Sequence, residues 1–404
     1  MSAPRILVAD SARAIAEVAR TIARASVVPI DVESNGLHAY RAALCTLQIG
    51  VVEGDGVEVA EVHVVDPVVA ARSAPIDEVL APLRDALGAS GPKKIVHDLG
   101  FDARILAKHA LPLGNVFDTS LAARFLGVTS TSLAAIVQAR LGVVLSKELQ
   151  QHDWGKRPLD AESLPYLAAD VAHLPAIARG LEEEVANKGI GPELEAETAW
   201  RLSTALAARD DDDPRPPWAR IKGMQELDGP TLAVLRQLAD VREEAARRWD
   251  VPPFKVIPNE TLIALARKRP KSAYEARAVR GLDRGRGAAI VGELLSAIRR
   301  SERERDVPAA ERDAFLAPPP PLSRAQIDAR RGREHRLLRW RRAEAKRRGV
   351  DEQVVLPGHC VQELADRAPA TREELATIGG IGAVRVERDA EAILAAVAGP
   401  PPRD

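Results

Sequence analysis

The stretch Val28-Pro-Ile-Asp31-Val-Glu33-Ser-Asn-Gly36 predicts a buried strand that ends in a turn. Its apolar residues favour a strand, and Asn35-Gly36 is a common turn signal. Side chains alternate along a strand with a period of two, so Asp31 and Glu33 should project from the same face. An isolated Asp-x-Glu pair is usually only a solvated strand end. The pair therefore indicates a metal site only if carboxylates from other segments lie close to it.

Two later segments supply such carboxylates. Asp102 follows residues 94–97, which we expect to form a short buried strand, and Asp170 closes the segment Tyr166-Leu-Ala-Ala-Asp170. Tyr166 and Asp170 are four residues apart on an expected helix, so they share a face. Asp102 alone could instead be an acidic residue favoured at a helix N-terminus. Hard divalent cations prefer several carboxylate oxygens, and phosphodiester hydrolysis often uses two such ions. The three segments together predict a two-metal site.

The order and setting of these segments resemble the ribonuclease D family, within the DEDD 3′-5′ exonucleases whose third motif carries tyrosine. The similarity is most specific in Asp153–Leu159, with the sequence DWGKRPL, and in the following Tyr166–Asp170, with the sequence YLAAD. It covers roughly residues 1–185. Two departures are His152, where serine is usual, and Pro165, which directly precedes the tyrosine. Proline is tolerated in a first helical turn, so Pro165 should mark a helix start.

The resemblance implies an α/β ribonuclease H-like exonuclease domain with a mixed sheet and two bound divalent ions, Mg²⁺ or Mn²⁺. It implies that Tyr166 is catalytic and that the catalytic metal ligands are Asp31, Glu33, Asp102 and Asp170. We expect the first two and Asp170 to hold one ion, and Asp31 with Asp102 to hold the other. Candidate substrate contacts are His97, Phe101, Trp154, Arg157 and Gln48. Trp154 is expected either to stack on a terminal base or to pack inside its loop, and Arg157 to pair with a phosphate.

Composition sets broad limits. A chain of 404 residues is long enough for two or three domains. Its net charge of −1 means that any surface for nucleic acid must be local. Cys45 and Cys360 give neither a metal spacing nor a disulfide framework. With no signal peptide and no apolar run of membrane length, we expect a cytoplasmic monomer without membrane contact.

The pattern along the chain predicts three domains, because strands alternate with helices first and helical spacing alone follows. The later regions resemble two HRDC domains, small helical bundles that form a divergent internal repeat. The Asp210–Asp213 run is a poor metal site, because adjacent aspartates in a linker lack a fixed geometry. The expected parts are the exonuclease domain 1–208, an acidic, proline-containing linker 209–217, the first HRDC domain 218–302, a proline-rich linker 303–323 and the second, divergent HRDC-like domain 324–400.

Basic residues concentrate between Arg324 and Arg348, with eleven basic side chains against three acidic ones. They are interpreted as contacts to RNA phosphates, although a solvated helix with internal ion pairs is the alternative. Glycines near Arg286 and Arg385 either let backbone amides approach phosphate or cap helices. The candidate nucleic-acid contacts are Lys255, Arg284, Arg286, Arg339, Arg341 and Arg342.

The resemblance to the ribonuclease D family implies a 3′-5′ exoribonuclease that releases nucleoside 5′-monophosphates from RNA with a free 3′ end. The resemblance implies transfer-RNA precursors and other structured RNA as substrates. One alternative is a DNA 3′-5′ exonuclease that works with a helicase, since the same site hydrolyses either polymer. A second is a catalytically inactive RNA-binding scaffold, which the complete set of carboxylates argues against. His97-Asp98 also suggests a histidine–aspartate metallohydrolase, but the remaining histidines are scattered.

Overall fold

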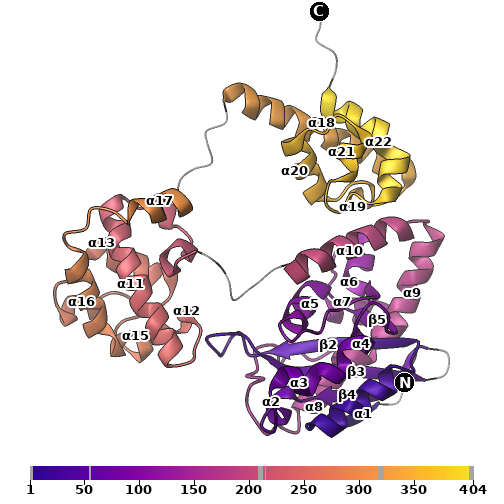
Figure 1. Ribbon diagram of the computed structural model, residues 1–404, viewed down its shortest axis with the longest axis horizontal. Helices are drawn as coiled ribbons and strands as arrows, with labels where there is room; N and C mark the ends of the chain where they lie inside the picture. The colour runs from indigo at the N-terminus through magenta and orange to yellow at the C-terminus, as the bar shows by residue number, and fades with distance from the viewer. Residues whose placement is uncertain (1–2, 54–55, 208–212, 214, 317–322, 400–404) are drawn as a thin grey trace, which may run out of the picture. The chain divides into compact units, whose positions relative to one another are not determined.

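The computed structural model describes residues 3–53, 56–207, 213, 215–316 and 323–399 (Figure 1). The chain divides into two compact units. The first contains residues 1–33, 44–208 and 322–404, and the second contains residues 34–43 and 209–321. Most of the predicted acidic linker, and Pro318–Pro321 of the second predicted linker, lie outside the described residues.

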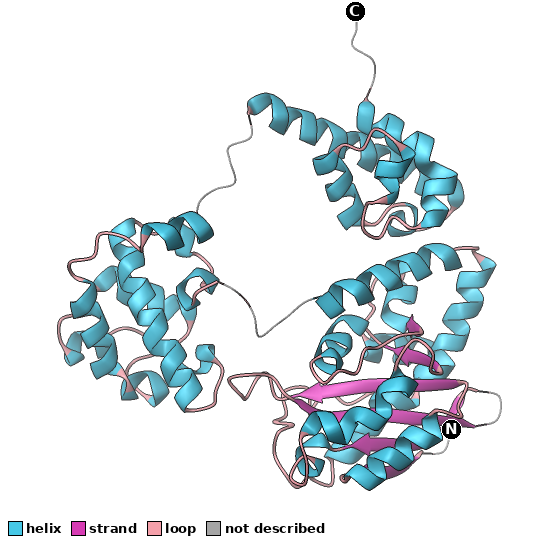
Figure 2. Ribbon diagram, viewed as in Figure 1, coloured by secondary structure: helices cyan, strands magenta, loops and turns pink. Residues whose placement is uncertain are grey.

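A six-stranded mixed sheet forms the base of the first unit (Figure 2). In spatial order its strands run β1-β4-β3-β2-β5-β6. β1 pairs parallel with β4, β4 antiparallel with β3, and β5 parallel with both β2 and β6. This mixed sheet confirms the predicted fold class, although the outer strands β1 and β6 were not predicted. The strands are β1 Arg5–Ala9, β2 Val27–Ser34, β3 Leu44–Glu53, β4 Glu58–Val65, β5 Lys93–Val96 and β6 Val116–Asp118.

Helices of the nuclease pack around this sheet, and their ends follow local signals. Ser11 caps α1 by accepting a hydrogen bond from the backbone of Ala14. The region 165–188, predicted as one helix, is two, because Pro175 lacks the amide hydrogen that a continuous helix needs. The longer helices are α1 Ala12–Ile22, α5 Leu99–Ala107, α6 Thr119–Phe125, α7 Leu133–Leu141, α8 Ser163–Ala172, α9 Leu174–Asn187 and α10 Gly191–Ala207; the short ones are α2 Pro67–Ala70, α3 Ile76–Leu80 and α4 Arg84–Leu87.

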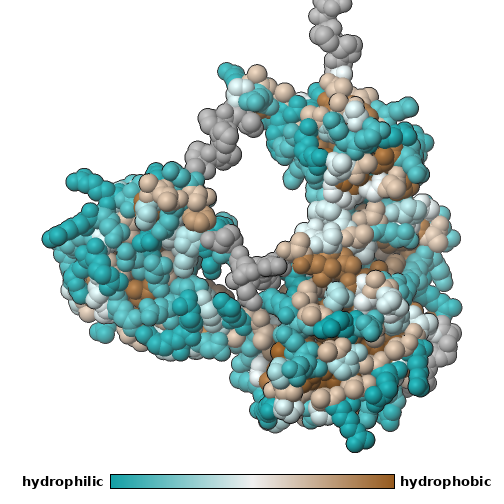
Figure 3. Space-filling view, in the orientation of Figure 1, coloured by the Kyte–Doolittle hydropathy of each residue, from teal (hydrophilic) through white to brown (hydrophobic). Residues whose placement is uncertain are grey.

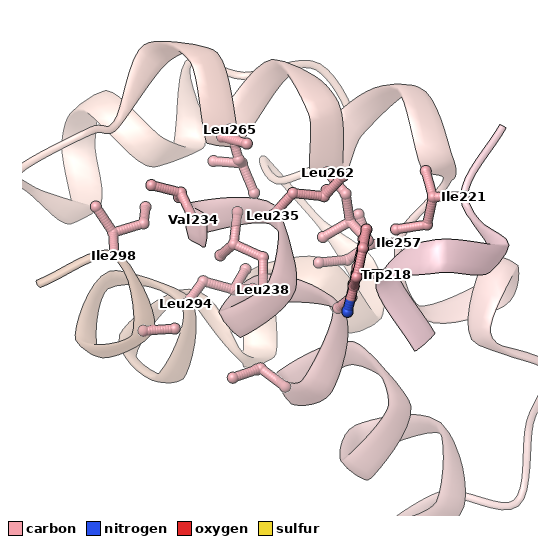
Figure 4. Packing of buried hydrophobic residues seen from close by; sticks show 14 of the residues in the cluster. Trp218, Ile221, Val234, Leu235, Leu238, Ile257, Leu262, Leu265, Leu294 and Ile298 are labelled. Carbon is pink, nitrogen blue, oxygen red and sulfur yellow. The ribbon is translucent and has the colours of Figure 1, made fainter. Parts of the chain in front are cut away.

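The first helical bundle makes up most of the second unit. Trp218 is part of its core and lies near Ile257 and Leu262 (Figure 4). The face of the bundle that Figure 3 shows is largely hydrophilic. Helix α17 falls inside the predicted linker 303–323, and its Glu311 accepts hydrogen bonds from Trp218 and Arg236. The helices are α11 Gly229–Arg248, α12 Pro253–Val256, α13 Asn259–Lys268, α14 Ala273–Arg277, α15 Gly285–Ala289, α16 Val291–Ser301 and α17 Ala309–Phe315.

The second helical bundle belongs to the same unit as the nuclease, because it packs on α10. Arg348 and Arg388 each donate a hydrogen bond of 2.7 Å to the buried Glu193. His359 stacks on Trp200 with 3.5 Å between ring centroids. The helices are α18 Arg324–Arg348, α19 Glu352–Val355, α20 Gly358–Arg367, α21 Arg372–Ala376 and α22 Ala383–Ala398.

Candidate active site

Strand β2 positions the first two carboxylates of the site. Val28, Ile30 and Val32 are buried on this inner strand, whereas Asp31 and Glu33 are only partly buried near its end. Oxygen atoms of Asp31, Glu33 and Asp170 all lie within 4.8 Å of one another. The structure thus brings together two acidic segments that are well over a hundred residues apart in the sequence.

Helix α8 positions Asp170 and Tyr166. Asp160 accepts hydrogen bonds from the backbone amide and the hydroxyl of Ser163, which secures the helix start just before Pro165. Tyr166 therefore lies in the first turn, as predicted, one turn before Asp170. A cavity of about 430 Å³ opens beside both side chains, lined by residues of α8 and of the loop before it.

Asp102 approaches the cluster from α5 and is buried. Asp118, at the end of β6, accepts hydrogen bonds of 3.0 Å from the backbone amides of Asp98 and Leu99 and thereby holds the start of α5. Asp98 has a left-handed backbone with a φ of 68°, which is uncommon outside glycine and typical of functional sites. Asp118 was not predicted, although an aspartate that directly precedes Thr-Ser is a recognisable helix cap.

Burial raises the pKa of every carboxyl in this cluster, and repulsion from neighbouring carboxylates adds to the rise for Glu33, Asp102 and Asp170. Burial raises the pKa of Asp31 to about 7. Burial, with repulsion from Asp31, raises the pKa of Asp170 to about 8. Burial and then repulsion from both of these carboxylates raise the pKa of Glu33 to about 9, and the pKa of Asp102 lies well above its ordinary value for similar reasons. Among the described residues, no lysine or arginine lowers the pKa of these four carboxyls, so their mutual repulsion is not offset there.

The donor set fits hard divalent cations. All of its ligand atoms are carboxylate oxygens, which suit magnesium or manganese better than softer metals. Asp102 Oδ2 is buried and has no hydrogen-bond partner among the described residues. A buried, unpartnered carboxylate oxygen is costly unless a cation or water satisfies it. The cluster therefore has both the chemistry and the unmet need of a metal site.

Comparison with known proteins agrees with this geometry. Residues 7–186 match the family model of a 3′-5′ exonuclease, and residues 231–298 and 331–397 each match the HRDC domain. Ribonuclease D of Zymomonas mobilis is 32% identical over 75% of this chain and 74% of its own length. The chain belongs to the ribonuclease D family. This membership confirms the predicted class of enzyme, a 3′-5′ exoribonuclease.

Further matches extend over most of the ribonuclease D fold. Ribonuclease D of Sphingobium indicum is 29% identical over 68% of this chain and 67% of its own length. The crystal structure of Escherichia coli RNase D, described as an exoribonuclease involved in structured RNA processing, superposes with a TM-score of 0.65 at 21% identity. It covers 98% of this chain and 100% of the E. coli chain. At that identity the structural likeness supports the fold alone.

Three side chains that were expected to touch substrate are buried instead, those of Trp154, Arg157 and Gln48. Trp154 packs against Tyr166, with 5.8 Å between ring centroids, so its ring is not free to stack on a base. Arg157 is buried in an ion pair of 2.5 Å with Asp66 and donates to the carbonyl of Cys45. It is therefore not free to pair with a phosphate. Trp154 and Arg157 support the loop before α8, and the expectation of direct contact is corrected for all three.

The other candidate contacts differ in accessibility. Phe101 is exposed beside Asp102 and can face a substrate. His97 is partly buried, and its Nδ1 lies 2.8 Å from the hydroxyl of Thr119. Burial lowers the pKa of His97, which favours a neutral ring. Gln48 is fully buried in β3 and donates to Thr46, so this structure gives it a role inside the sheet.

The predicted nucleic-acid contacts also separate by burial. Arg341 is 7% exposed and donates to the carbonyl of Glu352, so its predicted phosphate contact is corrected to a structural one. Arg342, the next residue, is 79% exposed. Arg339 is exposed on the same helix. In the first bundle, Arg284 and Arg286 are exposed, whereas Lys255 Nζ lies 3.2 Å from His38 Nδ1.

Proposed function

We propose that this member of the ribonuclease D family releases nucleoside 5′-monophosphates one at a time from the 3′ end of RNA. We further propose that it uses two divalent ions, Mg²⁺ or Mn²⁺, and that transfer-RNA precursors are among its substrates. The observation that carries the proposal is the cluster of Asp31, Glu33 and Asp170, which Asp102 completes. In this proposal the enzyme is a cytoplasmic monomer.

The four carboxylates would share two ions. The charge of Asp31 acts on each of the other three carboxyls, since it raises the pKa of Glu33, Asp102 and Asp170. We assign Asp31, Glu33 and Asp170 to one ion, and Asp31 with Asp102 to the second. When bound, such ions supply a more acidic water and a stabilised leaving 3′ oxygen.

Tyr166 would position the attacking water. Burial, followed by repulsion from Asp170 and Glu33, raises the pKa of its phenol above the ordinary value. The phenol is therefore protonated at neutral pH and acts as a hydrogen-bonding group that orients water, in preference to a base. Trp154 supports this role, because its buried ring packs on the tyrosine and limits its movement.

An exposed basic stripe on α18 would hold longer RNA. Helical periodicity places its residues on one side of the helix, where all are solvent-exposed. Asp328 lies on the same side, and Arg342 is 3.4 Å from Glu352. A row of cations suits a phosphate backbone, whereas the buried Arg341 does not contribute. The residues of this stripe are Arg324, Arg331, Arg339, Arg342 and Lys346.

The testing experiment is a digestion of matched RNA and DNA oligonucleotides with Mg²⁺. The expected products from a 3′-hydroxyl RNA are nucleoside 5′-monophosphates and a ladder of chains shortened from the 3′ end. A 3′-phosphate should block the reaction, and a circular RNA should stay intact. Cleavage of the circle, or faster digestion of DNA than of RNA, would contradict the proposal. Among the described residues no helix is long and apolar enough to cross a membrane.

A further inference from the structure

One segment between two strands of the nuclease sheet, Ser34–Ala43, belongs to the second compact unit. It joins β2 to β3 and begins directly after Glu33, which we assign to a divalent ion. The pairing of β2 with β5 covers Val27–Pro29, so it stops short of Glu33. The end of the strand that presents this carboxylate is therefore continuous with a segment that packs in the other unit.

Asn35 closes the base of this segment with three hydrogen bonds. Its backbone carbonyl accepts one of 2.7 Å from the amide of His38 and one of 2.9 Å from the amide of Ala39. Its side-chain Oδ1 accepts one of 2.9 Å from the amide of Ala43, at the far end of the segment. Because these bonds tie the two ends together, a displacement of the middle of the segment is transmitted to Asn35, two residues after Glu33.

Tyr40 anchors the segment on the first helical bundle. Its hydroxyl donates a hydrogen bond of 2.7 Å to the buried Glu243, and its backbone amide donates one of 3.1 Å to the carboxylate of Asp250. The guanidinium of Arg247 lies 5.6 Å from the centroid of the tyrosine ring, within the range of a cation–π contact. The ring also packs against the hydrophobic core of the bundle. The segment is thus held by α11 and by the residue that follows its end.

We propose that Tyr40 is a positioning residue for the active site: by docking the segment Ser34–Ala43 on α11, it holds Glu33 in the geometry that binds a divalent ion. The proposal rests on the two-ion site proposed above. The carboxylates of Asp31, Glu33 and Asp170 lie within 4.8 Å of one another and repel each other, so their arrangement needs a fixed backbone. Residues that orient a metal ligand without touching the metal contribute about ten- to a hundredfold to metal affinity. The first bundle therefore helps to build the nuclease active site.

The test measures binding of the divalent ion directly as well as catalysis. Binding of Mn²⁺ to the RNA-free protein is followed by electron paramagnetic resonance, and hydrolysis of a 3′-hydroxyl pentanucleotide is measured over a range of Mg²⁺ concentrations. The test variants are Tyr40→Ala and Tyr40→Phe. Leu37→Ala is the control within the same segment, since Leu37 is 49% exposed. Arg236→Ala is the control for loss of stability in the first bundle, because it removes an ion pair of 2.7 Å with Glu311.

Tyr40→Ala should weaken Mn²⁺ binding about tenfold and raise the Mg²⁺ concentration for half-maximal hydrolysis by the same factor. At saturating Mg²⁺ most of the wild-type kcat should return, because the metal ligands themselves are intact. Tyr40→Phe keeps the ring and the bond from the amide, so its loss of affinity should be smaller. Both controls should bind Mn²⁺ like wild type, although Arg236→Ala should unfold at a lower denaturant concentration.

Wild-type Mn²⁺ affinity in Tyr40→Ala would overturn the proposal. An equal loss of affinity in Arg236→Ala would also overturn it, because general destabilisation of the bundle would then explain the effect. If Tyr40→Ala does not fold, the same comparison is made with Tyr40→Phe, and wild-type affinity in that variant overturns the proposal. A wild-type protein whose Mn²⁺ binding depends on Tyr40 but that hydrolyses no RNA would overturn the proposed function alone.

Discussion

The carboxylates of the candidate active site and the buried Glu193 both lie in the first unit, and they differ in their partners. Asp31, Glu33, Asp102 and Asp170 face one another and have raised pKa values. Burial alone would also raise the pKa of Glu193, but hydrogen bonds from Arg348 and Arg388 lower it below its ordinary value. Arg348 and Arg388 both pair with Oε1 of Glu193, whereas its Oε2 has no hydrogen-bond partner among the described residues. The difference between the two sites is therefore the presence of paired arginines beside Glu193. An unpaired buried charge indicates a ligand site, whereas a paired one indicates structure.

The largest expected effect is loss of catalysis on removal of one carboxylate from the unpaired cluster. Asp31→Asn should cost about 5 kcal/mol of transition-state stabilisation, a several-thousandfold loss of kcat/KM, because it removes a ligand of both proposed ions. The melting temperature should stay constant or rise, since like-charge repulsion falls. Single-turnover hydrolysis and thermal melting measure the two effects. Asp10→Asn, on an exposed side chain, is the matched control; full activity in Asp31→Asn would remove the basis for the metal site.

Removal of the paired carboxylate, Glu193, should lower stability and leave catalysis unchanged. Glu193→Ala should lower the free energy of unfolding by about 3–5 kcal/mol, because it removes the carboxylate that pairs with Arg348 and leaves Arg388 with Asp389 alone. The folded fraction should keep its activity on a pentanucleotide. Chemical denaturation provides the measurement. Glu183→Ala, which removes an exposed pair with Arg179 at 3.8 Å, should cost less than about 1 kcal/mol. Similar losses in both variants would show that the interface with the second bundle contributes little.

The pH dependence of stability offers a third distinction. In the unfolded chain the carboxyls of Asp31, Glu33 and Asp170 titrate near pH 4, whereas in the folded protein their pKa values are about 7, 9 and 8. The folded state thus holds protons that the unfolded chain has released, so metal-free stability should fall as pH rises from about 4 to 9. Chemical denaturation in a chelating buffer across this pH range measures the loss.

Divalent ions should reverse this loss of stability. Their binding requires ionised carboxylates and stabilises the folded state by about 2.7 kcal/mol at a hundredfold excess over Kd. Mg²⁺ or Mn²⁺ should therefore raise the melting temperature more at pH 8 than at pH 5. Asp31→Asn should reduce the difference, and an equal metal effect at both pH values would argue against the raised pKa values.

The smallest expected effect concerns two neighbouring arginines, one exposed and one buried. Arg342→Ala should weaken binding of long RNA by less than about 1 kcal/mol and leave the unfolding free energy nearly unchanged, because the side chain is exposed. Arg341→Ala should instead destabilise the second bundle, since its buried guanidinium bonds the carbonyl of Glu352. Salt-dependent binding and denaturation separate the two. If the two variants changed RNA affinity and unfolding free energy to the same extent, the different burial of Arg341 and Arg342 would not explain their roles.

Local sequence patterns determined much of the nuclease site. Strand alternation aligned Asp31 with Glu33, and helical spacing aligned Tyr166 with Asp170, because both relations depend only on backbone geometry. The proline at position 165 marked the start of α8 for a similarly local reason. The resemblance to the family then predicted that these segments meet and that Asp102 lies with them. The spacing of the residues in the sequence did not by itself predict that contact.

Only the tertiary structure decided which side chains are free to act. Trp154 and Arg157 occur in the most recognisable motif of the sequence, yet the fold buries both. Arg286 and Arg385 both follow glycine-containing turns, yet one is exposed and the other is buried. Burial depends on which distant segment packs against a residue, and no local period encodes that partner. The sequence by itself determined the chemistry available to this protein, and long-range packing determined where that chemistry is exposed.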